Sequence, residues 1–332
     1  MSDSTNPVLV TGGSGYLGSH VVAALLRDGR RVRATVRSQA REAGLREAVR
    51  RGGADDARLE VVAAELTADA GWKQAMAGVQ EVHHVASPIP AAQPADPDEL
   101  IVPAREGTLR VLGAARDAGV RRVVLTSSFA AIGYTPKPDA EHPGHPEFTE
   151  ADWTDPDTPG LAPYPRSKAI AERAAWDLMA DGGTELVAVN PTAIFGPTLT
   201  PALGSSMQLI KALLDGTMSV APRLRFGVAD VRDVADLHLR AMAAPQAAGK
   251  RFLALADGPA LSFLELAAIL RDRLGDLAAL APTTEADGPE VPRPVIHNDR
   301  ARQELGWRPR PAETTIVESA ESLRDLGLLT HR

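Results

Sequence analysis

A tyrosine and a lysine stand four residues apart in the segment Tyr164-Pro165-Arg166-Ser167-Lys168. On a helix this spacing places both side chains on one face, where they can act together. The positive charge of a lysine favours the ionised form of a tyrosine, whose ordinary pKa near ~10 is otherwise too high for proton transfer at neutral pH. The pair therefore predicts a proton-transfer site in which Lys168 makes Tyr164 a usable acid.

A serine pair ends the apolar run Val123-Val124-Leu125-Thr126-Ser127-Ser128. If this run is a central strand of a parallel sheet, the pair lies at the carboxyl end of the strand, where such sheets bind ligands. Ser128 could then donate a hydrogen bond to a substrate carbonyl, and Ser127 is the alternative if the register is off by one residue. A serine pair is also common at the start of a turn, so that reading stays open.

A glycine-rich turn follows an apolar run near the N-terminus, in the segment Val8-Leu9-Val10-Thr11-Gly12-Gly13-Ser14-Gly15-Tyr16-Leu17-Gly18. A strand, a turn of this kind and a helix together bind the pyrophosphate of a dinucleotide, because glycines permit the tight turn and the close approach of the backbone. The motif can be read as G-x-G-x-x-G from Gly13 or as G-x-x-G-x-x-G from Gly12, and the spacing does not decide between them. The candidate contacts are Gly12, Gly15, Tyr16, Leu17 and Gly18.

An arginine stands where many dinucleotide-binding proteins have an acidic residue, at the end of the second predicted strand in Val36-Arg37-Ser38. A carboxylate there binds the ribose hydroxyls of NAD and repels the 2′-phosphate of NADP. A guanidinium instead fits the phosphate with paired hydrogen bonds and stacks on adenine. Arg37 therefore indicates NADP(H). The alternative is that Arg37 is a solvated surface residue without a ligand, because the chain is rich in arginine.

Short runs of Val, Leu and Ile alternate with longer helical segments through the first 190 residues. This alternation predicts an α/β protein with a doubly wound parallel sheet, the Rossmann fold, and places every residue named above near the carboxyl ends of its strands. The expected strands are Val8–Thr11, Arg31–Val36, Leu59–Ala63, Glu81–Ala86, Arg122–Ser127, Glu185–Asn190 and Arg251–Leu255, and the expected helices begin near Tyr16, Arg41, Ala70, Glu99 and Tyr164.

The regular alternation stops after Asn190. We expect a dinucleotide-binding domain over 1–190, rejoined by about 229–256, and a smaller mixed domain over 191–332 that binds substrate. Its helices are expected near Ser205–Asp215, Ser262–Leu274, Asp299–Leu305 and Glu313–Leu326.

Composition excludes several classes of protein. The 332 residues carry a net charge of −7 with no long run of one sign, which argues against a nucleic-acid partner. The absence of cysteine excludes disulfides, thiolate metal sites and a cysteine nucleophile. Because there is no apolar run long enough to span a membrane and no secretory signal, we expect a cytoplasmic protein. We expect it to be a monomer or a homodimer. His83 and His84 are adjacent on a predicted strand and point to opposite faces, and His142 and His145 lie in a Pro-rich loop, so no metal is expected.

Taken together, the motifs resemble those of the extended short-chain dehydrogenase/reductase family over nearly the whole chain. The matching segments are Thr11–Gly18, Thr126–Ser128 and Tyr164-x-x-Ser167-Lys168. Within that family the chain is similar to the branch of dihydroflavonol reductases, cinnamoyl-CoA reductases and yeast-type aldehyde/ketone reductases, on the segments Arg33–Arg37, His84–Pro88, Asn190–Thr192, Gly196-Pro197 and Asp230–Ala235.

The resemblance implies a hydride transfer from NADPH to a carbonyl carbon, with Tyr164 giving a proton to the oxygen and Ser128 orienting that oxygen. Lys168 would also hold the nicotinamide ribose. The resemblance further implies cofactor contacts at Glu65 and Leu66 near the adenine, at Ala86 and Ser87, and at Pro191 beside the nicotinamide. Glu65 departs from the family's aspartate.

The substrate is less well defined. Flavonoid reductases of this branch have an asparagine after the serine that contacts the substrate, and Phe129-Ala130-Ala131-Ile132-Gly133 contains none. A wall of Phe129, Ile132 and Phe195 fits a hydrophobic aldehyde, ketone or β-keto ester, and the same residues could equally be core. The segment 134–163 could form a flap over the site.

Two other functions remain as alternatives. A sugar-nucleotide epimerase or dehydratase of the same superfamily would keep NAD bound, and Arg37 argues against it. A non-catalytic NADP sensor would bind partner proteins through the same fold, and the intact Ser128, Tyr164 and Lys168 argue against that.

Overall fold

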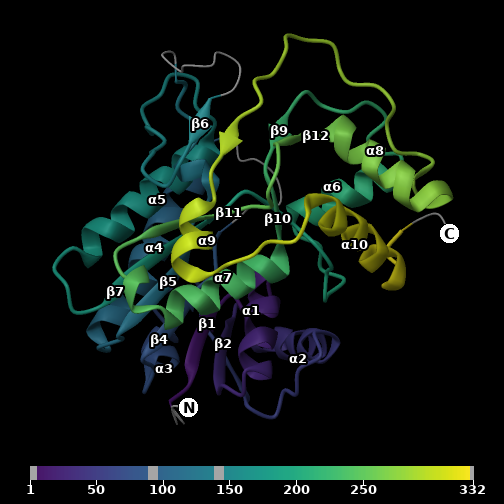
Figure 1. The fold of residues 1–332 in the computed structure, drawn as a ribbon. Helices are drawn as coiled ribbons and strands as arrows, with labels where there is room; N and C mark the ends of the chain where they lie inside the picture. The colour runs from purple at the N-terminus through teal and green to yellow at the C-terminus, as the bar shows by residue number, and fades with distance from the viewer. Residues whose placement is uncertain (1–5, 89–95, 138–145, 330–332) are drawn as a thin grey trace.

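Seven buried strands form one parallel sheet at the centre of the molecule, in the order β11-β7-β5-β4-β1-β2-β3 (Figure 1). The structure is a computed structural model that describes residues 6–88, 96–137 and 146–329. The strands are β1 (Val8–Thr11), β2 (Val32–Val36), β3 (Leu59–Ala63), β4 (Glu81–His84), β5 (Arg122–Thr126), β7 (Glu185–Pro191) and β11 (Arg251–Ala254). The strand order reverses between β1 and β4, as in a doubly wound sheet, and this confirms the predicted fold class.

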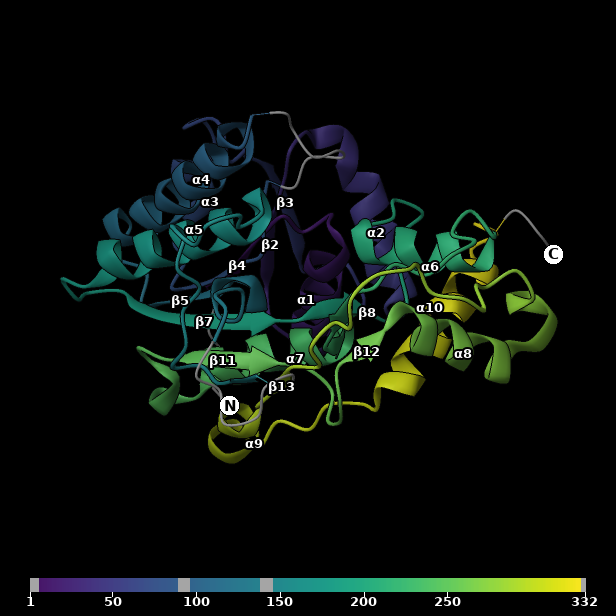
Figure 2. The same cartoon turned by 90° about the horizontal axis from the view of Figure 1, so that it is seen from above.

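Helices cover both faces of the sheet, since successive side chains of each buried strand point to opposite sides. On β1, Val8 and Val10 join the core beneath one group of helices, and Leu9 joins the core beneath the other. The first group is α1 (Tyr16–Arg27), α2 (Glu42–Arg51), α7 (Val231–Ala243) and α9 (Asp299–Leu305). The second is α3 (Trp72–Met76), α4 (Asp98–Asp117) and α5 (Pro163–Met179), seen along one side of the sheet in Figure 2.

A third core lies at one end of the sheet, where α6 (Ser205–Leu214), α8 (Phe263–Leu274) and α10 (Ala312–Asp325) pack together (Figure 2). We call this part the C-terminal lobe. Small strand pairs accompany it: β8 (Ala193–Phe195) with β10 (Val228–Asp230), and β9 (Arg225–Phe226) with β12 (Leu261–Ser262). A further pair joins β6 (Glu147–Phe148) to β13 (Val295–Ile296). The division of the chain into domains at residue 190 stays a prediction.

The predicted strands and helices agree with the structure to within a few residues. One difference has a clear cause at the end of β4, which was expected to reach Ala86 and ends at His84. The amides of Val85 and Ala86 donate to the Thr11 hydroxyl instead of to a neighbouring strand. Among the described residues no helix is both long and apolar enough to cross a membrane.

Histidines are buried on both faces of β4. His84 Nδ1 lies 2.8 Å from Thr11 Oγ1, and the ring of His83 lies 5.6 Å from that of His238 on α7, so the two neighbours point to opposite faces. Burial lowers the pKa of His83 and of His84 to about 3, helped by the positive charges of Arg30 and Lys168 respectively. Both histidines are therefore neutral in the folded protein at physiological pH. His142 and His145 lie outside the described residues.

The buried histidines predict a loss of stability in mild acid. The unfolded chain takes up protons near pH 6.5, whereas folded His83 does so only near pH 3. The histidine therefore lowers the free energy of unfolding as the pH falls below 6.5, by up to about 1.4 kcal/mol per pH unit. In urea unfolding between pH 7 and pH 5, His83→Leu should reduce the average slope by about 1 kcal/mol per pH unit, because the limiting slope is reached only well below pH 6.5. Val82→Ala, on the same strand, should lower stability without changing the slope.

Candidate active site

The glycines of the turn after β1 meet different steric demands. Gly12 has a positive φ of 68°, and a Cβ on Gly18 would lie 2.1 Å from the Gly12 oxygen, so neither position accepts a side chain without movement. Gly13 lies against β2, where a Cβ would stand 2.7 Å from the Ala34 Cβ. Gly15 is the N-cap of α1, is exposed, and leaves the first amides of the helix free to bind an anion.

Tyr16 and Leu17 contribute to this helix start in other ways than through their side chains. The Tyr16 hydroxyl donates to the carbonyl of Gly196 at 2.6 Å, and burial, with the nearby Asp230 carboxylate, raises its pKa well above the ordinary value. Leu17 is 6% exposed and belongs to the core. What these two residues can offer a dinucleotide is therefore the backbone N–H.

The hydroxyl of Thr11 joins the turns after β1 and β4. The hydroxyl oxygen accepts hydrogen bonds from the amides of Val85 at 3.1 Å and of Ala86 at 3.0 Å. Its O–H therefore donates to Nδ1 of His84, which is the ring nitrogen without a hydrogen. A Cβ on Gly12 would lie 2.9 Å from Ala86 Cα. The two turns thus pack directly against each other, and sequence reasoning missed Thr11 because a buried strand residue gives no sign of such a role.

The residues predicted near the adenosine end lie after β2 and β3. Arg37 is exposed and has no hydrogen bond or ion pair within the part of the chain that the structure describes. Glu65 is exposed, and its carbonyl accepts from the Trp72 indole at 3.1 Å. The carbonyl of Leu66 accepts from Arg110. The backbone of this loop is therefore fixed, while the guanidinium of Arg37 is free to bind a phosphate.

Tyr164 and Lys168 lie on one face of α5, which begins at Pro163 because a proline needs no hydrogen-bonding partner in the first turn of a helix. Lys168 Nζ lies 5.8 Å from the centre of the Tyr164 ring and donates to Ser87 Oγ at 2.9 Å. Tyr164 is 39% exposed. The lysine thus connects the tyrosine with the turn after β4.

The serine pair divides into two roles. Ser127 donates its hydroxyl proton to the buried carboxylate of Glu172. Ser128 begins a short 3-10 helix, η2 (Phe129–Ala131), and its Oγ accepts from the Ala130 amide at 3.1 Å. The hydroxyl proton of Ser128 therefore remains available to a ligand, which favours Ser128 over Ser127 as the substrate-orienting residue.

The three apolar candidates for the substrate pocket differ in burial. Ile132 and Phe195 are each 1% exposed, so of the two readings that the sequence left open, core packing describes them. Phe129 is half-buried, with its ring edge-to-face on Phe148 at 5.6 Å. Tyr134, which sequence reasoning did not single out, is 49% exposed and packs on Phe129 at 6.1 Å. Its pKa is raised by burial and then by neighbouring Tyr164. Pro191 is buried at the end of β7.

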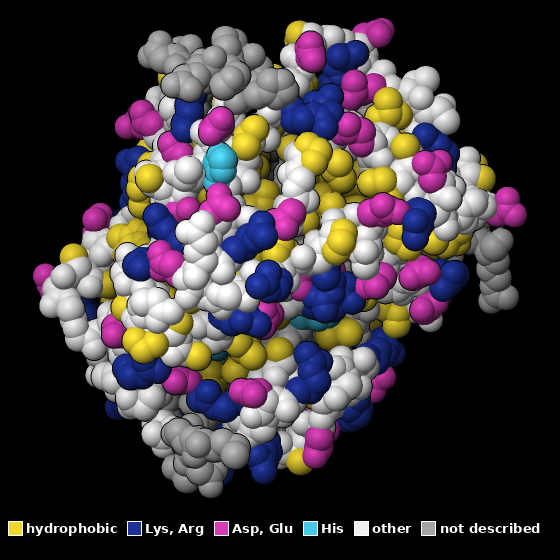
Figure 3. Space-filling model, in the orientation of Figure 1, with side chains coloured by type: hydrophobic (Ala, Val, Ile, Leu, Met, Phe, Trp, Pro, Cys, Tyr) yellow, Lys and Arg dark blue, Asp and Glu magenta, His cyan; other side chains and the backbone are white. Residues whose placement is uncertain are grey.

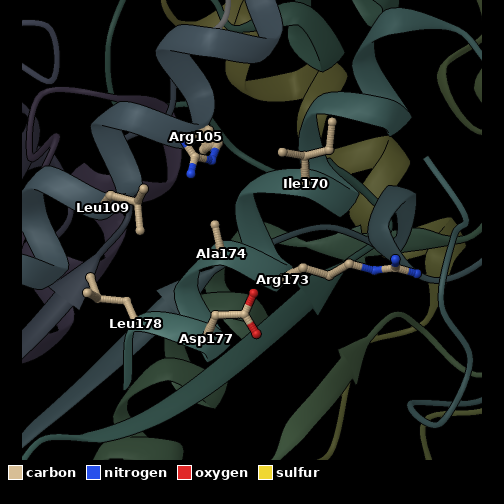
Figure 4. Close-up of a pocket in the computed structure, with 7 residues that line it drawn as sticks. All are labelled: Arg105, Leu109, Ile170, Arg173, Ala174, Asp177 and Leu178. Carbon is tan, nitrogen blue, oxygen red and sulfur yellow. The ribbon is translucent and has the colours of Figure 1, made fainter. Parts of the chain in front are cut away.

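The described part of the structure contains two hollows near α5, and one of them lies at the predicted site. A cavity of about 20 Å³, enough for one water molecule, lies between the end of β5 and α5 and is lined by Ser87, Ser127, Lys168 and Glu172, among others. A shallower depression of about 430 Å³ lies between α4 and α5 (Figure 4) and contains none of the predicted site residues. Basic and acidic side chains are interspersed over the face shown in Figure 3.

Comparison with known proteins agrees with this geometry. Residues 8–254 match the model of the NAD dependent epimerase/dehydratase family. Cinnamoyl-CoA reductase CAD2 of Medicago truncatula is 34% identical over 327 residues, which cover 98% of this chain and 97% of that one. Dihydroflavonol 4-reductase of Hordeum vulgare is 28% identical over 337 residues, covering 99% and 92%.

Solved structures point the same way. Yeast methylglyoxal/isovaleraldehyde reductase Gre2, complexed with NADPH, has a TM-score of 0.81 at 26% identity over 97% of this chain and 100% of that one. UDP-glucose 4-epimerase of Thermotoga maritima, with a TM-score of 0.76 at 18% identity over 96% and 99%, shares the fold alone. The chain therefore belongs to the NAD dependent epimerase/dehydratase family. The predicted reductase branch is confirmed, and the chain is an NAD(P)-dependent oxidoreductase.

The crowding around Gly18 predicts that Gly18→Ala weakens NADPH binding by about tenfold or more, because the added Cβ displaces Gly12. Titration of cofactor fluorescence measures the dissociation constant. The matched control is Gly113→Ala, within α4, where a Cβ meets no atom within 4 Å. Since alanine is a better helix former, this control should keep its affinity and gain stability. Equal affinity in the two variants would contradict the assignment of the turn.

Proposed function

We propose that this chain is an NADPH-dependent carbonyl reductase that acts on hydrophobic aldehydes, ketones or β-keto esters. One arrangement carries the proposal. Tyr164 lies beside Lys168, which reaches Ser87 after β4, and Ser128 with a free hydroxyl proton follows β5. The carboxyl ends of β4 and β5 adjoin in the sheet, so these groups border one region.

The residues present fit NADPH at each part of the molecule. The turn from Gly12 to Gly18 and the free amides of α1 suit the pyrophosphate. The guanidinium of Arg37, which has no partner among the described residues, suits the 2′-phosphate. Lys168, Ser87 and Pro191 would bind at the nicotinamide end, and Glu65 with Leu66 at the adenine end. When bound, NADPH supplies the hydride. Yeast Gre2, a structural neighbour, is a reductase complexed with NADPH.

The protein's own residues then bind and protonate the carbonyl group. Ser128 donates a hydrogen bond to the carbonyl oxygen, which holds that oxygen near Tyr164 and polarises the C=O bond. Tyr164 gives its proton to the oxygen as the carbonyl carbon accepts the hydride, so that one alcohol forms and a tyrosinate remains. The ammonium of Lys168 stabilises that tyrosinate until solvent returns the proton.

The substrate would lie against the half-buried Phe129 and the exposed Tyr134 at the mouth of the site. Phe129 and Tyr134 pack on each other beside Tyr164, and they supply the apolar surface that the buried Ile132 and Phe195 do not. The segment 134–163 as a flap stays part of the proposal, and residues 138–145 of it lie outside the described part.

Tyr164→Phe tests the reaction. Wild type should oxidise NADPH with at least one member of a panel of aromatic aldehydes, aliphatic ketones, β-keto esters and acyl-CoA thioesters. The kcat of the variant should fall by about 10²-fold or more, because phenylalanine has no proton to donate. A loss of this size is typical when a general acid is removed. Circular dichroism and the dissociation constant of NADPH, both unchanged, serve as controls.

Full activity in the variant would contradict the mechanism. Turnover without added cofactor would favour the epimerase, and NADPH binding without any turnover would favour the sensor.

Arg37→Asp tests the cofactor. The carboxylate repels the 2′-phosphate, so the KM for NADPH should rise by about 30-fold or more while that for NADH changes little. Arg31→Asp is the matched control, because this exposed arginine precedes β2 whereas Arg37 follows it. Initial rates with both cofactors measure the preference. An equal rise in both variants would indicate a general effect of charge and no phosphate contact at Arg37.

A further inference from the structure

We propose that Glu172 is a positioning residue that holds Ser128 in its reactive orientation; this inference rests on the proposed function. Glu172 lies one helical turn after Lys168 on α5, and it is 1% exposed. Its carboxylate takes no part in the proton transfer. It lies behind the site, on the wall of the 20 Å³ cavity that Lys168 also lines.

Both carboxylate oxygens of Glu172 are fully engaged. Oε1 accepts from Arg251 Nε at 2.6 Å and from the Trp176 indole at 3.2 Å. Oε2 accepts from Asn190 Nδ2 at 2.7 Å, from the Ser127 hydroxyl and from Arg251 Nη2 at 3.3 Å. A buried carboxylate with this many donors is fixed in orientation.

The connection to Ser128 runs through Asn190 at the end of β7. Its Nδ2 donates both to Glu172 Oε2 and to the carbonyl of Ser128, the latter at 3.2 Å. Both partners are acceptors, so the amide can present only its nitrogen to them. Asn190 is fully buried. Glu172 therefore fixes the side chain of Ser127 directly and the backbone of Ser128 through one intermediary.

The partner of Glu172 extends the same network to the segment after the serine. Arg251 is 6% exposed, and its guanidinium lies 3.7 Å from the centre of the Trp153 ring. It donates to the carbonyls of Glu150 at 3.0 Å and Asp152 at 2.6 Å, and to that of Ala131, the last residue of η2, at 3.4 Å. The ion pair thus fixes the chain on both sides of Ser128, from Ser127 to Ala131, relative to the helix that bears Tyr164.

A double-mutant cycle separates this role from a merely structural one. In Glu172→Gln one oxygen becomes an amide nitrogen, whose hydrogens face either the donors of Arg251 and Trp176 or those of Arg251, Asn190 and Ser127. In both orientations Arg251 loses an acceptor, so the serine turn shifts. We expect kcat to fall by about 10- to 100-fold, the order expected of a misplacement near 1 Å, with the KM for NADPH within about twofold of wild type. If Glu172 acts through Ser128, adding Glu172→Gln to Ser128→Ala should lower kcat by less than about threefold more. A double variant whose losses multiply would overturn the proposal.

Two further variants serve as a control and a second test. Asp233→Asn alters another buried carboxylate, which lies on α7 and accepts from the amide of Arg310 at 2.6 Å and from its guanidinium, so among the described residues it has no hydrogen bond to α5 or to the serine turn. Its kcat should stay within about twofold of wild type, and a loss equal to that of Glu172→Gln would overturn the proposal. Ser127→Ala removes only one hydrogen bond to Glu172, so it can replace Glu172→Gln in the test if that variant does not fold. Ser127→Ala should lower kcat when Ser128 is present. It should not lower kcat further when it is added to Ser128→Ala.

The wild-type assay keeps the two proposals apart. If the wild type is active and the losses of kcat multiply in the double variant, the result contradicts only the role of Glu172. The proposed carbonyl reductase function is then unaffected. Absence of wild-type turnover with every carbonyl in the panel contradicts both the proposed function and the role that rests on it.

Discussion

All seven parallel strands end at the same edge of the sheet, and the buried backbone and hydroxyl groups of the turns that follow them need hydrogen-bonding partners within the protein. The protein meets this demand with a few buried side chains. The Thr11 hydroxyl accepts hydrogen bonds from two amides of the turn after β4. In the turn after β5, Asn190 donates to the Ser128 carbonyl and Glu172 accepts from the Ser127 hydroxyl. In the proposed site, these side chains take up the hydrogen bonds of the turns and leave the hydroxyl groups of Ser128 and Tyr164 available to a ligand.

The sequence predicted the sheet and its edge well, since buried parallel strands are short, continuous apolar runs that stand out between helical segments. The functional candidates at that edge are also local patterns: a glycine turn, a serine pair after a strand, and a tyrosine and lysine at helical spacing. Each such pattern can be read within about a dozen residues. The structure brings the glycine turn and the serine pair to the same edge of the sheet, where β4 lies between β1 and β5.

What the sequence could not predict depends on contacts between distant residues. Glu172 and Arg251 are 79 residues apart, and neither carries a sign of the other. Ile132 and Phe195 are apolar residues near the site, and apolar residues suit a pocket wall and a core equally until burial is known. The pairing of β6 with β13 joins residues about 150 positions apart through two-residue strands, for which no periodicity can form.

The hydrogen bond from Tyr16 to Gly196 has a consequence for how the molecule is made. It closes a loop of 180 residues, and the amide of Gly196 in turn donates to Ser319 on α10. The first helix is synthesised long before either partner leaves the ribosome, and closing so long a loop carries an entropic cost that the new contacts must offset. The start of that helix therefore reaches its final form only after nearly the whole chain has been translated, and a protein cut short before α10 would have the glycine turn without the support beneath it.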